Sequence, residues 1–146
     1  MDKPQNISLN LVRTIKAAPE KVFAAWTEPE TLKRWMAPGD DMSVALAETD
    51  LRAGGRYRIV MRGAKGTEHR VGGVYREIVP GKKLSFTWAS ESSPESETLV
   101  TIELRQNGVG TELTLTHTKF ATEQSRDMHN QGWNGCLAKL ERLMAA

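Results

Sequence analysis

The sequence has one cysteine, Cys136, and no long apolar run, and both shortages exclude whole classes of protein. A single thiol forms no internal disulfide and cannot supply a zinc site built from cysteine pairs. Because no stretch of about 18 consecutive apolar residues occurs, we expect no transmembrane helix. The N-terminal segment MDKPQNISLNLVRTIK lacks the apolar core of a signal peptide. We therefore expect the protein to remain in the reducing cytoplasm.

An excess of one charge is also missing. The 20 Lys and Arg residues face 18 Asp and Glu residues, which leaves a net charge of +2. Such a balance gives no general case for a nucleic acid or an anionic membrane as partner. The three histidines, His69, His117 and His129, do not follow one another at a metal-binding spacing. Nucleophile motifs and phosphate-binding glycine loops are absent as well, so we expect no metal and no cofactor and assign no catalytic residue.

The chain does have enough apolar material for one core. It has 146 residues, of which 39% are hydrophobic, and this size is typical of a single domain. No internal repeat, linker or low-complexity tract divides the sequence. We therefore expect one domain over residues 1–146.

The first part of the chain changes from a strand pattern to a helix pattern. Residues 5–15 alternate apolar and polar side chains, which predicts a strand. Ala18-Pro19-Glu20 then predicts a helix start, because proline loses no needed hydrogen bond at the first helical position. A second start at Pro29 precedes Leu32, Trp35 and Met36, so a second short helix is expected up to Pro38-Gly39.

A period of two dominates residues 42–118 and predicts six antiparallel strands. They are segments 42–49, 56–62 and 68–79, then three strands around Phe86, Ile102 and Leu115. The helical period returns over about 122–144, where Trp133, Cys136, Leu137 and Leu140 share one stripe. The fold class is α+β, with helices against one face of a seven-stranded antiparallel sheet.

A sheet with one polar face must cover its other face, and one long helix is too narrow to cover all of it. Gly72-Gly73 inside a strand predicts a bulge or bend that curves the sheet around the helix. Such wrapping favours a cleft between sheet and helix, where apolar ligands bind. Gly132 and Gly135 weaken the helix by about 1 kcal/mol each. The two glycines allow either close packing of the helix on the sheet or space for a ligand. Their spacing in the sequence is compatible with both interpretations.

Several local patterns resemble a known family. They include Arg13-Thr14-Ile15, Trp26-Thr27-Glu28-Pro29-Glu30, Gly73-Val74-Tyr75-Arg76-Glu77, Leu84-Ser85-Phe86-Thr87-Trp88 and Gly132-Trp133. Their order along nearly the whole chain is similar to the activator of heat-shock-protein-90 ATPase homologue family, within the START-like (SRPBCC) superfamily. The resemblance implies the helix-grip fold, a curved seven-stranded sheet around a long C-terminal helix with two short helices after the first strand. It implies a cavity and says little about chemistry.

The cleft predicts a set of ligand-binding residues on the inward strand face and on the helices. They are Trp35, Tyr57, Ile59, Met61, Phe86, Trp88, Val100, Ile102, Leu113, Leu115, His117, Met128 and Trp133. Ordinary core packing is the alternative for each apolar member. His117 could be a polar anchor or an acid–base group, although a strand-end histidine bonded to the backbone is the favoured interpretation. We expect His69 in solvent and His129 as a helix cap or surface group.

Three functions follow. The leading hypothesis is a non-catalytic module that holds an apolar or amphipathic small molecule between the sheet and the C-terminal helix. The second, implied by the resemblance, is a chaperone-associated interaction domain in which Arg56, Arg58 and Arg62 meet an acidic protein. The third is a cyclase-type or hydratase-type enzyme that depends on His117. Roles in stress response, transport or sequestration are all compatible with these patterns. The sequence specifies neither the ligand nor the oligomeric state.

Overall fold

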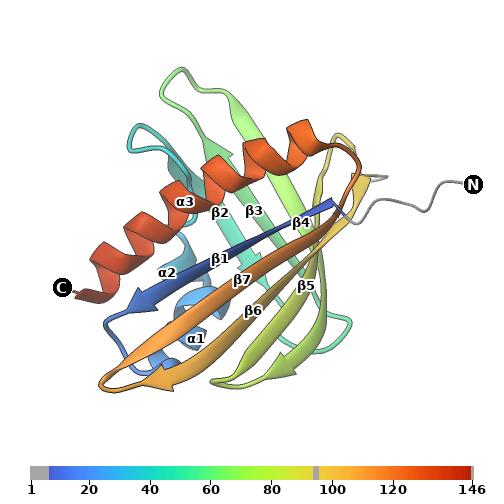
Figure 1. Ribbon diagram of the computed structural model, residues 1–146. Coiled ribbons are helices and arrows are strands. Elements are labelled where there is room, and N and C mark those ends of the chain that lie inside the picture. Colours follow the sequence, from blue (N-terminus) through green and yellow to red (C-terminus); the bar gives the residue numbers. More distant parts are fainter. Residues whose placement is uncertain (1–6, 94–95, 146) are drawn as a thin grey trace, which may run out of the picture.

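Seven antiparallel strands curve around one long helix (Figure 1). The computed structural model describes residues 7–93 and 96–145. The strands are β1 (Ile7–Ile15), β2 (Ser43–Thr49), β3 (Arg56–Arg62), β4 (Glu68–Val79), β5 (Lys83–Ser90), β6 (Thr98–Asn107) and β7 (Gly110–Phe120). The helices are α1 (Pro19–Thr27), α2 (Pro29–Leu32) and α3 (Glu123–Ala145). Gln5 and Asn6, part of the predicted first strand, lie outside the described residues.

The strand order is β1-β7-β6-β5-β4-β3-β2, so β1 and β2 form the two edges of the sheet. Neighbouring strands from β2 to β7 are consecutive in the sequence and pair antiparallel. The connection from β1 to β2 crosses from one edge to the other and carries α1 and α2. Figure 1 shows these short helices at the end of the sheet near the C-terminus of α3. The helix-grip layout predicted from the sequence is confirmed.

Turn chemistry sets the register of the hairpins. Gly108 adopts φ 62°, in the left-handed region that favours glycine, and lies between the paired residues Asn107 and Gly110. The alternation that follows places Leu113, Leu115 and His117 on the inner face. Their opposite neighbours on β6 include Ile102 and Val100, which are also buried. The period of two therefore becomes one continuous apolar layer.

Three local predictions needed correction. Helix α2 ends at Leu32, and Arg34 and Trp35 donate to carbonyls three residues back, which is tighter than an α-helix. Strand β7 runs two residues past the predicted end, with Lys119 at φ 70°. The register shift of β4 against β5 lies between Tyr75 and Glu77, beyond the glycine pair where a bulge was expected.

Gly73 has a different role from the predicted bulge. A Cβ at this position would overlap the carbonyl oxygen of Thr87 on β5. The Thr87 hydroxyl accepts from the backbone nitrogen of Val74 at 2.8 Å, in place of a regular ladder contact. The residue thus lets two strands approach closely where the sheet curves.

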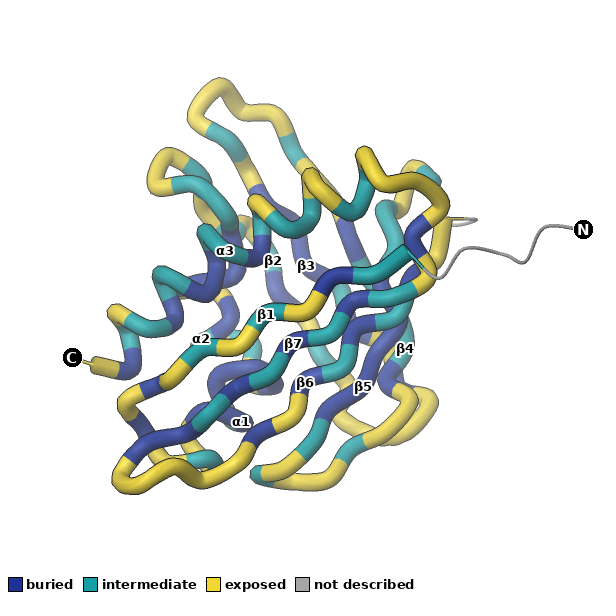
Figure 2. Tube along the Cα trace, in the orientation of Figure 1, coloured by how far each residue is buried: buried dark blue, intermediate teal, exposed yellow. Residues whose placement is uncertain are grey.

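The core lies between the concave face of the sheet and the three helices. Figure 2 shows buried residues along the inner strand face and exposed ones at the hairpins. The buried residues of α3 are Trp133, Cys136, Leu137, Leu140 and Met144. All of them come from the C-terminal two thirds of the helix, and none of the residues 123–132 in its first turns is buried.

Candidate functional site

An open pocket of about 420 Å³ lies between α3 and the far strands of the sheet. We call it the helix pocket. Its walls come from β3, β4, β5, the segment after α2 and the first half of α3. They are lined by Met36, Pro38, Met42, Met61, His69, Val71, Trp88, Ser90, Met128, His129, Gly132, Trp133 and Cys136. The volume is within the range of small-molecule sites.

The helix pocket exists because α3 lies toward one edge of the sheet. The helix packs mainly against β1 and also against β7, and this leaves β3 and β4 uncovered opposite its first turns. A Cβ at Gly135 would overlap the Pro38 carbonyl oxygen, so the absent side chain permits close approach there. Lys139 fixes the same segment by donating from Nζ to the Gly39 carbonyl at 2.6 Å. The segment after α2 is thereby held as one wall of the pocket.

Methionine is the most frequent side chain of the helix pocket. Four of the six methionines of the chain line it, namely Met36, Met42, Met61 and Met128. The thioether side chain is unbranched and polarizable, so it adapts to irregular apolar shapes. Met128 is 65% exposed although it is apolar. This composition suits an apolar guest of variable shape.

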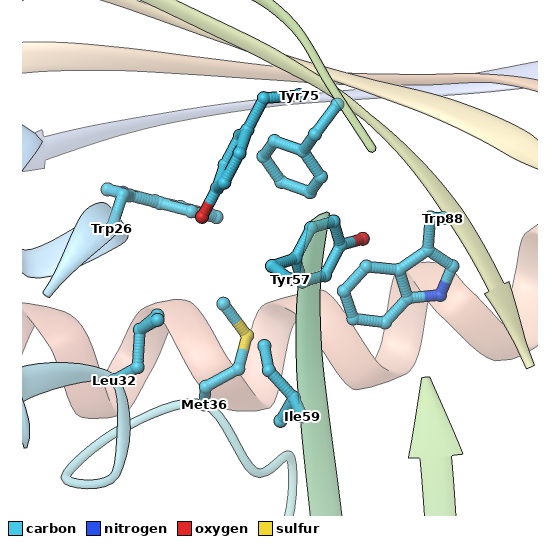
Figure 3. Close-up of a pocket in the computed structure, with 8 residues that line it drawn as sticks. Trp26, Leu32, Met36, Tyr57, Ile59, Tyr75 and Trp88 are labelled. Atoms are coloured by element: carbon cyan, nitrogen blue, oxygen red, sulfur yellow. The ribbon is translucent and has the colours of Figure 1, made fainter. Parts of the chain in front are cut away.

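A second, much smaller space is lined entirely by buried residues, and we call it the inner pocket. It measures only about 10 Å³, close to the smallest space that holds one water molecule. Figure 3 shows the side chains around it, which are Trp26, Leu32, Met36, Tyr57, Ile59, Tyr75, Phe86 and Trp88. Met36 and Trp88 line both pockets, so these two side chains separate them.

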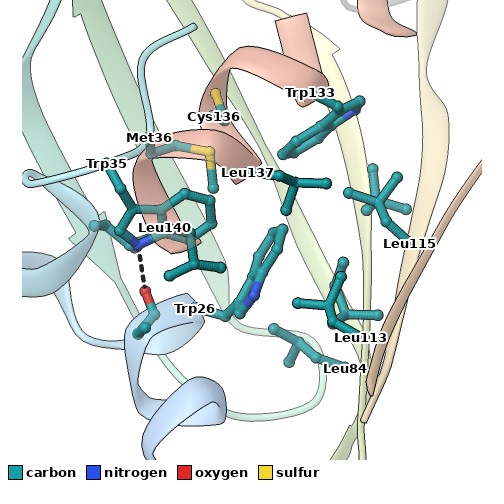
Figure 4. Close-up of a cluster of buried hydrophobic side chains, with 14 of the residues drawn as sticks. Trp26, Trp35, Met36, Leu84, Leu113, Leu115, Trp133, Cys136, Leu137 and Leu140 are labelled. Carbon is teal, nitrogen blue, oxygen red and sulfur yellow. Dashed lines mark hydrogen bonds between the residues drawn. The ribbon is translucent and has the colours of Figure 1, made fainter. Parts of the chain in front are cut away.

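A cluster of packed aromatic side chains lies beside the two pockets. The indoles of Trp88 and Trp133 pack directly against each other, with 5.1 Å between their ring centroids. Trp26 packs 5.8 Å from Trp133 and 4.6 Å from Trp35, and Figure 4 shows this group with the leucines around it. Aromatic pairs of this kind contribute about 0.5–1.5 kcal/mol beyond their buried area.

His117 is buried and held by side chains, which corrects the expected backbone contact. Its Nδ1 accepts from the indole Nε1 of Trp133 at 3.0 Å, so its proton is on Nε2. That nitrogen donates to the Thr98 hydroxyl at 2.6 Å, and the hydroxyl donates to the Trp88 carbonyl at 2.9 Å. Burial, and then the charge of nearby His129, lower the pKa of His117 to about 3. Because both ring nitrogens are engaged, the ring has no free lone pair to act as a base.

His129 lies inside α3, which corrects its expected place as a cap or surface group. Its Nδ1 donates to the Ser125 carbonyl at 2.8 Å, and the ring packs against Phe120 at 5.1 Å between centroids. The half-buried ring reaches the wall of the helix pocket. His69 is exposed, as predicted, and contributes to the rim of the same pocket.

The predicted site residues divide into three groups. Met61, Trp88, Met128 and Trp133 line the helix pocket. Tyr57, Ile59 and Phe86 line the inner pocket. The other six, Trp35, Val100, Ile102, Leu113, Leu115 and His117, are buried in the core and belong to the lining of neither pocket.

Some lining residues were not predicted. Tyr75 and Val71 share the inward parity of β4, which alternation could have indicated. Trp26 also lines the inner pocket, although the sequence indicated it only as part of the family resemblance. Met36, expected in the second short helix, and Met42 both lie outside any regular element.

The surface that carries Arg56, Arg58 and Arg62, which we call the arginine face, has less unpaired charge than the sequence suggested. Arg58 forms two hydrogen bonds with Glu91, at 2.6 and 3.2 Å. Arg62 contacts Glu68 at 2.8 Å, and Glu68 also pairs with Arg70. The pKa values of both glutamates are lowered by these arginine hydrogen bonds. An acidic partner would therefore compete with internal carboxylates.

Residues 7–93 and 96–145 contain no group of three or more His, Cys, Asp or Glu side chains that could hold a metal ion. No helix among the described residues combines the length and apolar character needed to cross a membrane.

Comparisons with known proteins agree on one family. A family model described as activator of Hsp90 ATPase homolog 1-like protein matches residues 16–145. No curated protein matched the chain in sequence. Among solved structures, protein CV1439 from Chromobacterium violaceum is 26% identical with a TM-score of 0.87, over 95% of this chain and 97% of that one. The AHSA1 protein from Silicibacter pomeroyi is 26% identical with a TM-score of 0.83, over 95% of this chain and 98% of that one. Protein NE0264 from Nitrosomonas europaea is 27% identical with a TM-score of 0.81, over 95% and 94% respectively.

Proposed function

Because the chain belongs to the activator of Hsp90 ATPase homolog 1-like protein family, we propose that it uses this fold as a small-molecule binding module. The helix pocket holds an apolar or amphipathic ligand between α3 and strands β3 to β5. The observation that carries the proposal is the open pocket of about 420 Å³, in which four methionines and two tryptophans are among the thirteen lining residues. A space of this size with so few polar groups favours an apolar guest over a charged one.

The chemistry around the pocket favours binding over catalysis. His117, the residue that an enzyme hypothesis needs, is held neutral between Trp133 and Thr98. Cys136 lines the helix pocket, but burial raises the pKa of its thiol to about 12. A neutral thiol is a poor nucleophile. Neither group is activated for a reaction.

Association with a chaperone is the second candidate, and the family description favours it. The arginine face is a weaker argument for it, because Arg58 and Arg62 already pair with carboxylates. We place the protein in the cytoplasm, where a reducing environment suits its single buried thiol.

A truncation at the rim of the helix pocket tests the binding proposal. Met128→Ala removes an apolar side chain that is 65% exposed, so the free energy of unfolding should change by less than about 0.5 kcal/mol. The affinity for acetylnaphthalene, a neutral apolar probe, should fall about threefold to tenfold because a contact surface is lost. Isothermal titration calorimetry measures the affinity, and urea denaturation measures the stability.

Val109→Ala is the matched control, because Val109 is fully exposed in the hairpin after β6 and lies outside the pocket lining. It should leave the probe affinity unchanged. Absence of binding to the wild-type protein, or equal loss in the two variants, would remove the helix pocket as the site.

A further inference from the structure

Trp26 carries a buried hydrogen-bond donor that lacks a protein partner. Within residues 7–93 and 96–145, its indole Nε1 is the one buried side-chain nitrogen or oxygen without a hydrogen bond. The side chain is 3% exposed. Two neighbouring indoles are satisfied, since Trp35 donates to the Ala25 carbonyl and Trp133 donates to His117. A buried donor without an acceptor is costly, and such groups are rare in folded proteins.

Tyr75 supplies a second donor to the same inner pocket. The residue is 3% exposed, and its hydroxyl bonds to no other described residue, but its oxygen, unlike Trp26 Nε1, is not cut off from solvent. Figure 3 shows its ring reaching from β4 toward the side of the pocket that Trp26 forms. Burial raises the pKa of Tyr75 to about 12, so the hydroxyl keeps its proton at neutral pH. Tyr57, in the same lining, instead donates to the Thr87 carbonyl at 2.5 Å.

The lining of the inner pocket is apolar and aromatic, and the one charge that acts on Tyr75 is the negative charge of Asp50. The buried polar residues of the described chain are Thr27, Ser85, Thr87, Thr98, Thr111 and His117, and none of them is an acid, a lysine or an arginine. His117 is neutral, as its hydrogen bonds require. An anionic group would meet no compensating charge here, and its desolvation would be expensive. A neutral oxygen acceptor would meet donors at a much smaller desolvation cost.

The inner pocket and the helix pocket are neighbours. Met36 and Trp88 line both spaces, and the Met36 side chain is unbranched with three rotatable bonds. Its rotation would join the 10 Å³ space to the 420 Å³ space. A ligand body in the helix pocket could then extend one polar end toward Trp26 and Tyr75.

We propose that the ligand is a neutral apolar molecule with a carbonyl-type oxygen, which accepts hydrogen bonds from Trp26 Nε1 and the Tyr75 hydroxyl. This assignment rests on the proposed function of the helix pocket and names the class of molecule that the site selects. Ketones, esters and amides with an apolar body belong to this class. Fatty acids in their anionic form do not.

Three probes of one shape test this selectivity. Acetylnaphthalene carries the carbonyl oxygen, isopropylnaphthalene replaces it with a methyl group, and naphthoate carries a negative charge. Tyr75→Phe should lower the affinity for the ketone about fivefold to tenfold, the effect of one lost hydrogen bond. The affinity of the same variant for the hydrocarbon should change by less than about twofold. Naphthoate should bind the wild-type protein at least about tenfold more weakly than the ketone at neutral pH.

Tyr57→Phe is the matched control, because its hydroxyl is already bonded to Thr87. It should leave the ratio of ketone to hydrocarbon affinity unchanged. The indole signals in a nitrogen–proton NMR spectrum give a second readout on the wild-type chain, with Trp26 assigned through Trp26→Phe. The ketone should move the Trp26 signal downfield and the hydrocarbon should not, a result that does not depend on the folding of any Tyr75 variant.

The outcomes separate the two proposals. If the ketone binds but leaves the Trp26 signal unmoved, a buried water satisfies that donor and the carbonyl assignment is overturned, while the binding module stands. Equal effects of Tyr75→Phe on ketone and hydrocarbon overturn it in the same way. If none of the three probes binds the wild-type protein, the proposed function fails and the assignment fails with it.

Discussion

At the scale of single residues, His117 shows most clearly what burial does to chemistry. The sequence places it on the inward face of its strand, and that placement is confirmed by its complete burial. Its two partners are Trp133 on α3 and Thr98 on β6, and the Thr98 hydroxyl in turn donates to the carbonyl of Trp88 on β5. Such a network depends on the register of β5, β6 and β7, so inspection of residue 117 alone could not predict it.

The depressed pKa of His117 predicts a loss of stability in mild acid. The folded pKa is about 3 against an ordinary 6.5, so the unfolded chain binds a proton that the folded chain refuses. The stabilisation is complete above pH 6.5 and is lost as the pH falls toward 3. Below pH 6.5 the free energy of unfolding should decrease with a slope approaching about 1.4 kcal/mol per pH unit. Urea denaturation between pH 7.5 and 5 measures this slope.

His117→Gln provides the control for that slope. The amide retains an acceptor for Trp133 and a donor for Thr98 but does not titrate. Its stability curve should be flatter than that of the wild type between pH 6.5 and 5, a window above the range where carboxylates titrate. Parallel curves for the two proteins would mean that another group is responsible.

At the scale of elements, patterns of two and 3.6 residues predicted most of the architecture. Strands β3 and β4 match their predicted bounds, and α3 begins and ends one residue after its prediction. Periodicity succeeds where one face of an element is buried. It failed at α2, because Trp35 and Met36 are buried from a turn and not from a helical stripe. It also gave no sign that α3 would lie near β1 and leave β3 and β4 open.

The two glycines of α3 should respond in opposite ways to the same substitution. A Cβ at Gly132 would lie 3.8 Å from the Pro38 Cβ, an ordinary contact. Gly132→Ala should therefore stabilise the protein by about 0.5–1 kcal/mol through helix propensity. A Cβ at Gly135 would overlap the Pro38 backbone. Gly135→Ala should destabilise by about 1–3 kcal/mol, because backbone atoms must shift.

The midpoints of urea denaturation, compared between variants with the same m-value, distinguish these two changes in stability. Stabilisation by both substitutions would show that α3 does not lie against the Pro38 segment as described. Two losses of equal size would show that Gly132 is as tightly packed as Gly135. The two changes in stability should have opposite signs, because Gly132 has space for a side chain and Gly135 is closely packed.

At the scale of the whole molecule, the curved sheet supplies more concave surface than its helices cover. The uncovered part lies between the first turns of α3 and strands β3 to β5, where the helix pocket forms. The sequence predicted a cleft between sheet and helix together with four of its lining residues. Its position near one edge depends on how α3 packs against β1, which no local pattern encodes. The unsatisfied indole of Trp26 is likewise a property of the assembled core.

Methionine methyl NMR can detect a ligand in the helix pocket, and the chain carries its own control for this measurement. Met36, Met42, Met61 and Met128 line the helix pocket, whereas Met144 is buried near the other end of α3. Titration of carbon-13-methyl-methionine protein with acetylnaphthalene should move the signals of the four pocket methionines and leave the Met144 signal unchanged. Single Met→Leu variants assign the peaks. A saturable shift confined to the four pocket signals is the predicted result, and unmoved pocket signals or a shift at Met144 alone would contradict the account.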